Sequence, residues 1–162
     1  MADDFGLKIG LEGEKEFKKA LSEINQSFKV LGSEMKVVTS QFDKNDNSVQ
    51  ALTARNQVLN KEIEAQKQKI ETLRSALANA SESFGENDRR TQQWQIQLNN
   101  ATAALNDMER ELDRNNAALD DVEREMDDVA DSADDMSEEL DDAGDSAEKN
   151  KGKFESLSLI HI

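Results

Sequence analysis

The sequence predicts an all-α protein of long coiled-coil helices, with a helical hairpin and a short N-terminal strand or extended arm. The 162 residues contain no proline, the residue that most strongly interrupts a helix. Apolar residues recur at alternating spacings of three and four over most of the chain, which places them on one stripe of a helix. Because only 4% of residues are aromatic and 34% are charged, we expect narrow helix–helix contacts and no thick globular core.

Residues 1–12 follow a different pattern from the rest of the chain. Phe5, Leu7, Ile9 and Leu11 occupy every second position, which is typical of a strand. A single strand needs a partner, from elsewhere in the full protein or from another chain. A flexible arm is an equally good interpretation, because the glycines between these residues weaken a strand.

A first helix is predicted over residues 13–42, where the apolar spacing becomes helical. Polar turn formers at 43–48 separate it from the next helix. Asn47 is expected to cap that next helix, with Gln50 completing a capping box. The apolar stripe of the first helix consists of Phe17, Leu21, Ile24, Phe28, Leu31, Met35, Val38 and Phe42.

Two further helices, 47–84 and 87–143, continue the same heptad phase and are expected to form a coiled coil. Gly85 stands where a left-handed C-terminal cap is expected. A glycine turn permits an antiparallel hairpin, in which Leu73 or Leu77 would face the region around Leu98 and Ala101. Parallel self-association with other copies is the alternative. The residues predicted to line the coiled-coil interface are Val49, Leu52, Asn56, Leu59, Ile63, Ile70, Leu73, Leu77, Phe84, Leu98, Leu105, Met108, Leu112, Leu119, Val122, Met126 and Val129.

Two polar residues, Asn56 and Gln66, fall at core positions of the second helix. Polar residues at such positions fix the register or the oligomeric state of a coiled coil at some cost in stability. We therefore expect a structural role for both side chains and no role in binding a ligand.

The net charge of −15 is concentrated in one part of the chain. Residues 107–148 contain 19 acidic residues and 3 basic ones. Because aspartate is a poor helix former and like charges repel, we expect helicity to fade after Leu140 and residues 144–156 to form a flexible tail. Aspartate pairs recur there every seven residues, each directly after a core position: Asp120-Asp121, Asp127-Asp128, Asp134-Asp135 and Asp141-Asp142.

The sequence offers no candidate catalytic, cofactor-binding or metal-binding residues, so we expect no enzyme and no cofactor. It contains no cysteine, and its one histidine is His161. An EF-hand alignment on Gly144 fails, because Ala143 and Asn150 fall where calcium ligands are required. The acidic charge disfavours nucleic-acid binding. No apolar run approaches the ~20 residues that span a bilayer.

The chain resembles the N-terminus of tape measure proteins from tailed phages and prophages, especially of Gram-positive hosts. The resemblance covers about residues 2–156. It is carried by Ala2-Asp3-Asp4-Phe5-Gly6-Leu7-Lys8-Ile9, Glu14-Lys15-Glu16-Phe17-Lys18-Lys19-Ala20-Leu21, Phe42-Asp43-Lys44-Asn45 and Phe84-Gly85.

The resemblance implies a structural protein that lies in the lumen of the virion tail after assembly in the host cytoplasm. Tube subunits polymerise around such a protein, and its length fixes the length of the tail. The implied partners are the tail tube protein, tail assembly chaperones and tail-tip proteins. Self-association through the coiled coil is expected as well. We expect this segment to contact neither a membrane nor nucleic acid.

Two other functions fit the same helices. One is a cytoplasmic coiled-coil tether of the SMC-like type, which requires nucleotide-binding ends. The other is the stalk of a larger protein with a downstream cell-wall hydrolase domain. We expect the chain to be an N-terminal fragment. Residues 157–162, Leu-Ser-Leu-Ile-His-Ile, resemble a translated sequencing adapter, and we expect them not to belong to the natural protein.

Overall fold

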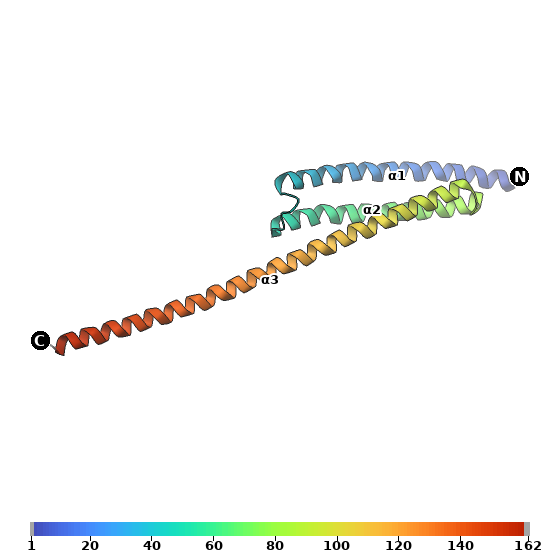
Figure 1. The fold of residues 1–162 in the computed structure, drawn as a ribbon. Helices are drawn as coiled ribbons and strands as arrows, with labels where there is room; N and C mark the ends of the chain where they lie inside the picture. The colour runs from blue at the N-terminus through green and yellow to red at the C-terminus, as the bar shows by residue number, and fades with distance from the viewer. Residues whose placement is uncertain (1, 161–162) are drawn as a thin grey trace. The chain divides into compact units, whose positions relative to one another are not determined.

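The chain folds into three α-helices in a computed structural model that describes residues 2–160, with side chains described for residues 10–156. The helices are α1 (Ala2–Gln41), α2 (Val49–Phe84) and α3 (Arg89–Ile160) (Figure 1). The predicted all-α fold class is confirmed. The chain divides into two units, one ending at Leu119 and one beginning at Asp120.

The predicted N-terminal strand or arm is not present, because residues 2–12 form the first turns of α1. A helix forms its main-chain hydrogen bonds internally, whereas a strand needs a neighbouring strand. Residues 2–160 contain no strand that could pair with residues 5–11. Glycines in this part of α1 serve close packing. A Cβ atom on Gly10 would lie 2.6 Å from the Cβ of Ser83, and one on Gly13 would lie 2.8 Å from Asn79 Nδ2. The two glycines therefore let α1 approach the last turns of α2.

The turn between α1 and α2 is held by polar contacts of its own residues. Ser48, and not the predicted Asn47, caps α2, and its hydroxyl accepts from the N–H three residues later at 3.3 Å. The Ser48 N–H donates to Asp46 Oδ1 at 2.8 Å. The Arg55 guanidinium donates to the carbonyl of Asp46 at 2.8 Å and to that of Asp43. These contacts tie the first turns of α2 to the residues of the turn itself.

The turn between α2 and α3 depends on Gly85, which has a φ of +86°. This value lies in a region that residues with a Cβ atom rarely adopt. The Asp88 carboxylate accepts from the Arg90 N–H at 2.9 Å and from its guanidinium at 2.9 and 3.0 Å. The same guanidinium lies 3.6 Å from the centroid of the Phe84 ring. The side-chain hydrogen bond from Arg90 lowers the pKa of Asp88 to about 2.

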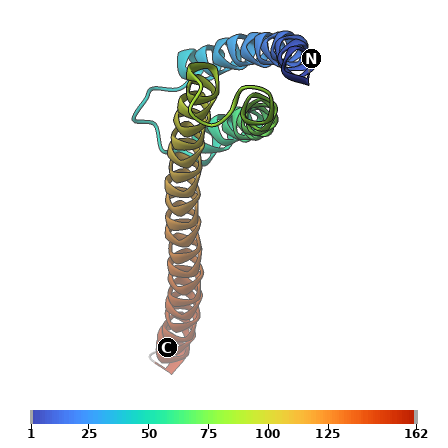
Figure 2. The same cartoon turned by 90° about the vertical axis from the view of Figure 1, so that its right-hand side faces the viewer.

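In the first unit, α2 packs against both other helices. Lys69 of α2 donates to Asn25 of α1 at 3.2 Å, and Gln66 of α2 donates to the Ala101 carbonyl of α3 at 2.7 Å. Figures 1 and 2 show α1 running beside α2, and the first turns of α3 lying next to α2. Each tight turn reverses the chain, so consecutive helices in this unit are antiparallel.

The second unit is a continuation of α3 from Asp120. Residues 144–156, predicted to be a flexible tail, are helical, and α3 continues to Ile160. The aspartate pairs do not end the helix, because their carboxylates are exposed to solvent and no proline interrupts the chain. Residues 157–162 lie outside the part for which side chains are described, and His161 lies outside the described backbone as well.

Candidate functional site: the helix–helix interface

The interface residues predicted on α2 lie where α2 meets its neighbours. The side chains of Leu52, Leu59 and Leu73 are almost completely enclosed. Polar Gln66 is also buried, 4% exposed. Of the predicted set, Leu52, Asn56, Leu59, Ile63, Ile70 and Leu73 are buried, and Val49, Leu77 and Phe84 are half-buried.

The interface residues predicted on α3 become more exposed along the helix. Leu98, Leu105, Met108, Leu112, Leu119 and Val122 are half-buried. Met126 and Val129 are exposed, at 61% and 68%. The heptad pattern continues across this change, so the sequence alone does not reveal where α3 loses its neighbour.

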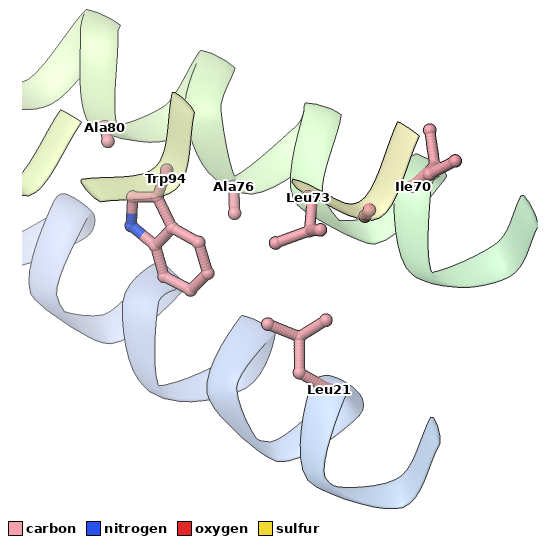
Figure 3. Packing of buried hydrophobic residues seen from close by; sticks show 7 residues of the cluster. Leu21, Ile70, Leu73, Ala76, Ala80 and Trp94 are labelled. Carbon is pink, nitrogen blue, oxygen red and sulfur yellow. The ribbon is translucent and has the colours of Figure 1, made fainter. Parts of the chain in front are cut away.

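The centre of the first unit brings together residues from all three helices. Figure 3 shows Leu21 of α1 pointing toward Leu73 of α2, with the indole of Trp94 from α3 between these two helices. Trp94 is only 4% exposed. The predicted proximity of Leu73 to the start of α3 agrees with this cluster, to which Leu98 also packs.

Sequence reasoning missed part of the buried surface of α2. Ala51, Val58 and Ala76 are buried although they lie outside the predicted heptad stripe. A single stripe of core positions serves one neighbouring helix, whereas α2 contacts two, so its buried arc must be wider. The adjacent apolar pairs Ala51-Leu52 and Val58-Leu59, seven residues apart, were the available signal.

Three asparagines form a polar contact across the α2–α3 interface. Asn56, 8% exposed, donates from Nδ2 to Asn116 Oδ1 at 2.9 Å. It accepts at Oδ1 from Asn115 Nδ2, also at 2.9 Å. Both ends of the Asn56 side chain are thus paired with neighbouring residues of α3.

Charged groups between the helices are only partly compensated. Lys61 of α2 pairs with Glu34 of α1 at 2.8 Å, but both side chains are largely exposed, so the pair contributes little to stability. Burial, together with the nearby Glu111 carboxylate, raises the pKa of Glu62 above its usual value. Glu62 of α2 and Glu111 of α3 are therefore an acidic pair between these two helices.

Open grooves run between the helices, and their side chains do not form a catalytic arrangement. One of about 470 Å³ is lined by residues of all three helices, including Phe28, Lys69 and Met108. A second, of about 420 Å³, lies between α1 and α2 and is lined by apolar residues around Val30 and Leu31 and by the polar side chains of Ser27, Lys61, Glu64 and Gln68. The Ser27 hydroxyl donates to the Glu23 carbonyl at 3.3 Å and not to either of these charged side chains.

Metal-binding and membrane-spanning features were sought over the described residues. In the range 10–156 no three acidic or histidine side chains lie close enough together to hold a metal ion. Residues 139–150, the segment of the EF-hand alignment, are helical and do not form a ligand loop. Among residues 2–160 no helix has an apolar stretch long enough to cross a bilayer.

Comparison with family models, with curated proteins and with solved structures found no match to this chain.

Proposed function

We propose that the chain is the N-terminal segment of a structural tape measure protein that determines the length of a phage or prophage tail. The observation that carries the proposal is the continuity of the helices. Residues 2–160 are helical apart from two short turns, at 42–48 and 85–88. A helix rises ~1.5 Å per residue, so a protein of this kind converts its number of residues into a distance.

The resemblance of residues 2–156 to tape measure proteins supports the same function. The proposed partners follow from this function. They are the tail tube protein that would surround the chain, the assembly chaperones, and the proteins of the tail tip.

Coiled-coil pairing is the finer part of the proposal. In the first unit the heptad positions of α2 are taken up by α1 and α3 of the same chain, which leaves few of them for a second copy. We propose that α2 and α3 pair as an antiparallel coiled-coil hairpin within one chain, with parallel self-association of copies as the alternative that the heptads also allow.

A change of chain length tests the function directly in the phage or prophage that encodes this reading frame. Two further copies of residues 120–140 preserve the heptad phase and are expected to lengthen the tail by about 63 Å. Deletion of residues 120–140 is expected to shorten it by about 32 Å. Tail lengths are measured on purified particles by electron microscopy.

A substitution that leaves the length unchanged is the control. Asp131→Glu, in the same exposed segment, is expected to give tails of the original length. Tails whose length does not follow the insertion and the deletion, or particles from which peptides of this chain are absent, would contradict the proposal.

A further inference from the structure

Beyond Val122, α3 carries apolar side chains that no described residue covers. Met126, Val129, Met136 and Leu140 are between 61% and 68% exposed. They continue the heptad spacing of the half-buried residues Leu105 to Leu119, so they share one side of the helix. We call these four residues the exposed stripe. Soluble proteins seldom leave a contiguous apolar surface without a partner.

Small residues lie on both sides of the exposed stripe. At 100° per residue, Ala130 and Ser137 lie along one side of it and Ser132 along the other. The Ser132 hydroxyl donates to the Asp128 carbonyl at 2.8 Å and so stays close to its own main chain. A neighbouring helix can therefore approach the stripe closely, and long side chains of that helix can pass over its edges.

Carboxylates lie at both edges of the exposed stripe and on the rest of the helix. At 100° per residue, Glu123 lies about 100° to one side of the centre of the stripe, and Glu125 and Glu139 lie about 60° and 100° to the other. The aspartate pairs lie further round, about 100–160° from that centre. The stripe is thus an apolar surface with acidic residues at both edges and an acidic far side.

We propose that the exposed stripe binds one basic amphipathic helix of another protein. The apolar residues of that helix would cover the stripe, and its lysine or arginine side chains would reach the glutamates at the edges of the stripe. Such side chains bury their methylene groups and keep the charged end in water, so they match an apolar surface with an acidic border. This inference does not depend on the proposed function.

A second copy of this chain is a poorer occupant for reasons of charge. Residues 107–148 contain 19 acidic residues and 3 basic ones, so pairing two copies would bring together two strongly negative segments. The charged residues directly beside the stripe are Glu123, Glu125 and Glu139, and a second copy supplies no base to face them. A basic helix gains from both the charge and the apolar contact, whereas a copy gains only from the latter.

Binding of a model peptide to the full chain tests the proposal. The probe is a synthetic amphipathic helix about four heptads long, with leucine and isoleucine at its core positions and lysine elsewhere. Two comparison peptides have glutamate in place of lysine, or the same residues in scrambled order. By fluorescence anisotropy at physiological salt we expect one basic helix to bind per chain, at least about tenfold more tightly than either comparison peptide.

Variants of the chain locate the binding surface. V129S/M136S is expected to weaken binding about tenfold by removing apolar contact. E125Q/E139Q is expected to weaken it and to reduce its salt dependence. The matched control is D131N/E138Q, which removes the same charge from the far side of the helix and is expected to have a clearly smaller effect. These positions are exposed, and circular dichroism verifies that each variant retains its helicity.

Three results would overturn the proposal. Equal binding of the scrambled peptide would show charge attraction without a docking surface. Equal effects of E125Q/E139Q and D131N/E138Q would show that the carboxylates at the edges of the stripe have no special place in binding. Sedimentation of the chain alone as a dimer that V129S/M136S dissociates would show that a second copy occupies the stripe.

Discussion

Asn56 of α2 and Asn116 of α3 join their side-chain amides at 2.9 Å inside an otherwise mainly apolar interface. Asn56 also accepts from Asn115 at the same distance, so its amide has a donor and an acceptor partner. The α3 asparagines are partly or fully exposed and can be hydrated when Asn56 is replaced. This contact lies far from the turn at Gly85, and we expect it to fix how the two helices align along their length.

Asn56→Leu is expected to raise the free energy of unfolding by roughly 1 kcal/mol, because an apolar residue at a core position packs without desolvating an amide. It is also expected to weaken the unique register of α2 on α3. Urea unfolding measures the first effect. Carbodiimide cross-linking of Lys67 to Glu109, whose charged atoms lie 4.0 Å apart, measures the second.

Gln57→Leu is the matched control for this substitution, because residue 57 is exposed on the same helix. It is expected to leave the Lys67–Glu109 cross-link unchanged. If Asn56→Leu kept the full cross-link yield, the asparagine contact would not be what sets the register.

Gly10→Ala and Gly32→Ala are expected to have opposite effects on stability, although both replace a glycine inside α1. At Gly10 the new Cβ would lie 2.6 Å from Ser83 Cβ and 2.7 Å from Phe84 Cζ, whereas at Gly32 it would meet nothing within 4 Å. We expect Gly10→Ala to cost about 1–3 kcal/mol through overpacking. Gly32→Ala is expected to gain about 0.5–1 kcal/mol, because alanine is the better helix former.

Urea unfolding of the two glycine variants gives the sign of each change. Hydrogen exchange adds the location, since Gly10→Ala should increase exchange of the first turns of α1 above that of α2. A stabilising effect of Gly10→Ala would mean that the start of α1 does not pack against Ser83 and Phe84.

The turn before α3 is expected to make stability depend on acid pH. The hydrogen bonds from Arg90 lower the pKa of Asp88 from 3.8 to about 2. A carboxyl whose pKa is lowered in the folded state contributes stability above pH 3.8, and this contribution is lost as the pH falls toward 2. Asp88→Asn should therefore lower the melting temperature above pH 4 and converge with the wild type near pH 2. Glu86→Gln, in the same turn, should leave the shape of the pH profile unchanged.

The sequence predicts much of the helical architecture, because long segments with spacings of three and four have one simple structural solution. The stripe of α1 from Phe17 to Phe42 is buried or half-buried throughout. The positive φ of Gly85 follows equally from the position of a glycine after a heptad helix. Its ψ of 160°, however, differs from that of the left-handed cap expected from the sequence.

Features that depend on the number of neighbours could not be read from one periodic pattern. The alternation of Leu7, Ile9 and Leu11 was too short to separate strand from helix, and the packing of Gly10 and Gly13 on α2 decides for the helix. Heptad spacing is the same at half-buried Leu112 and at exposed Met126, because the pattern marks a face and not the element that covers it. The candidate interface was therefore predictable by residue but not by its extent.

Glu62→Gln is expected to stabilise the chain at neutral pH more than Glu64→Gln, although both remove one negative charge from α2. Burial raises the pKa of Glu62, and the charge of Glu111 raises it further, whereas Glu64 is exposed. A raised pKa means that the protonated form is favoured in the folded state. The protonated Glu62 carboxyl makes its full contribution to stability below its ordinary pKa of 4.5. This contribution is lost as the pH rises through the raised pKa.

The melting temperatures of wild type and Glu62→Gln should therefore coincide near pH 4 and separate toward pH 7, with the variant more stable. Differential scanning calorimetry across this range measures the separation, and Glu64→Gln gives the effect of reducing net charge alone. Because glutamine keeps the size of the side chain and stays neutral at every pH, a separation larger than that of Glu64→Gln assigns the effect to the ionised Glu62 carboxylate beside Glu111. Equal separations for the two variants would assign it to net charge and leave no specific acidic pair between α2 and α3.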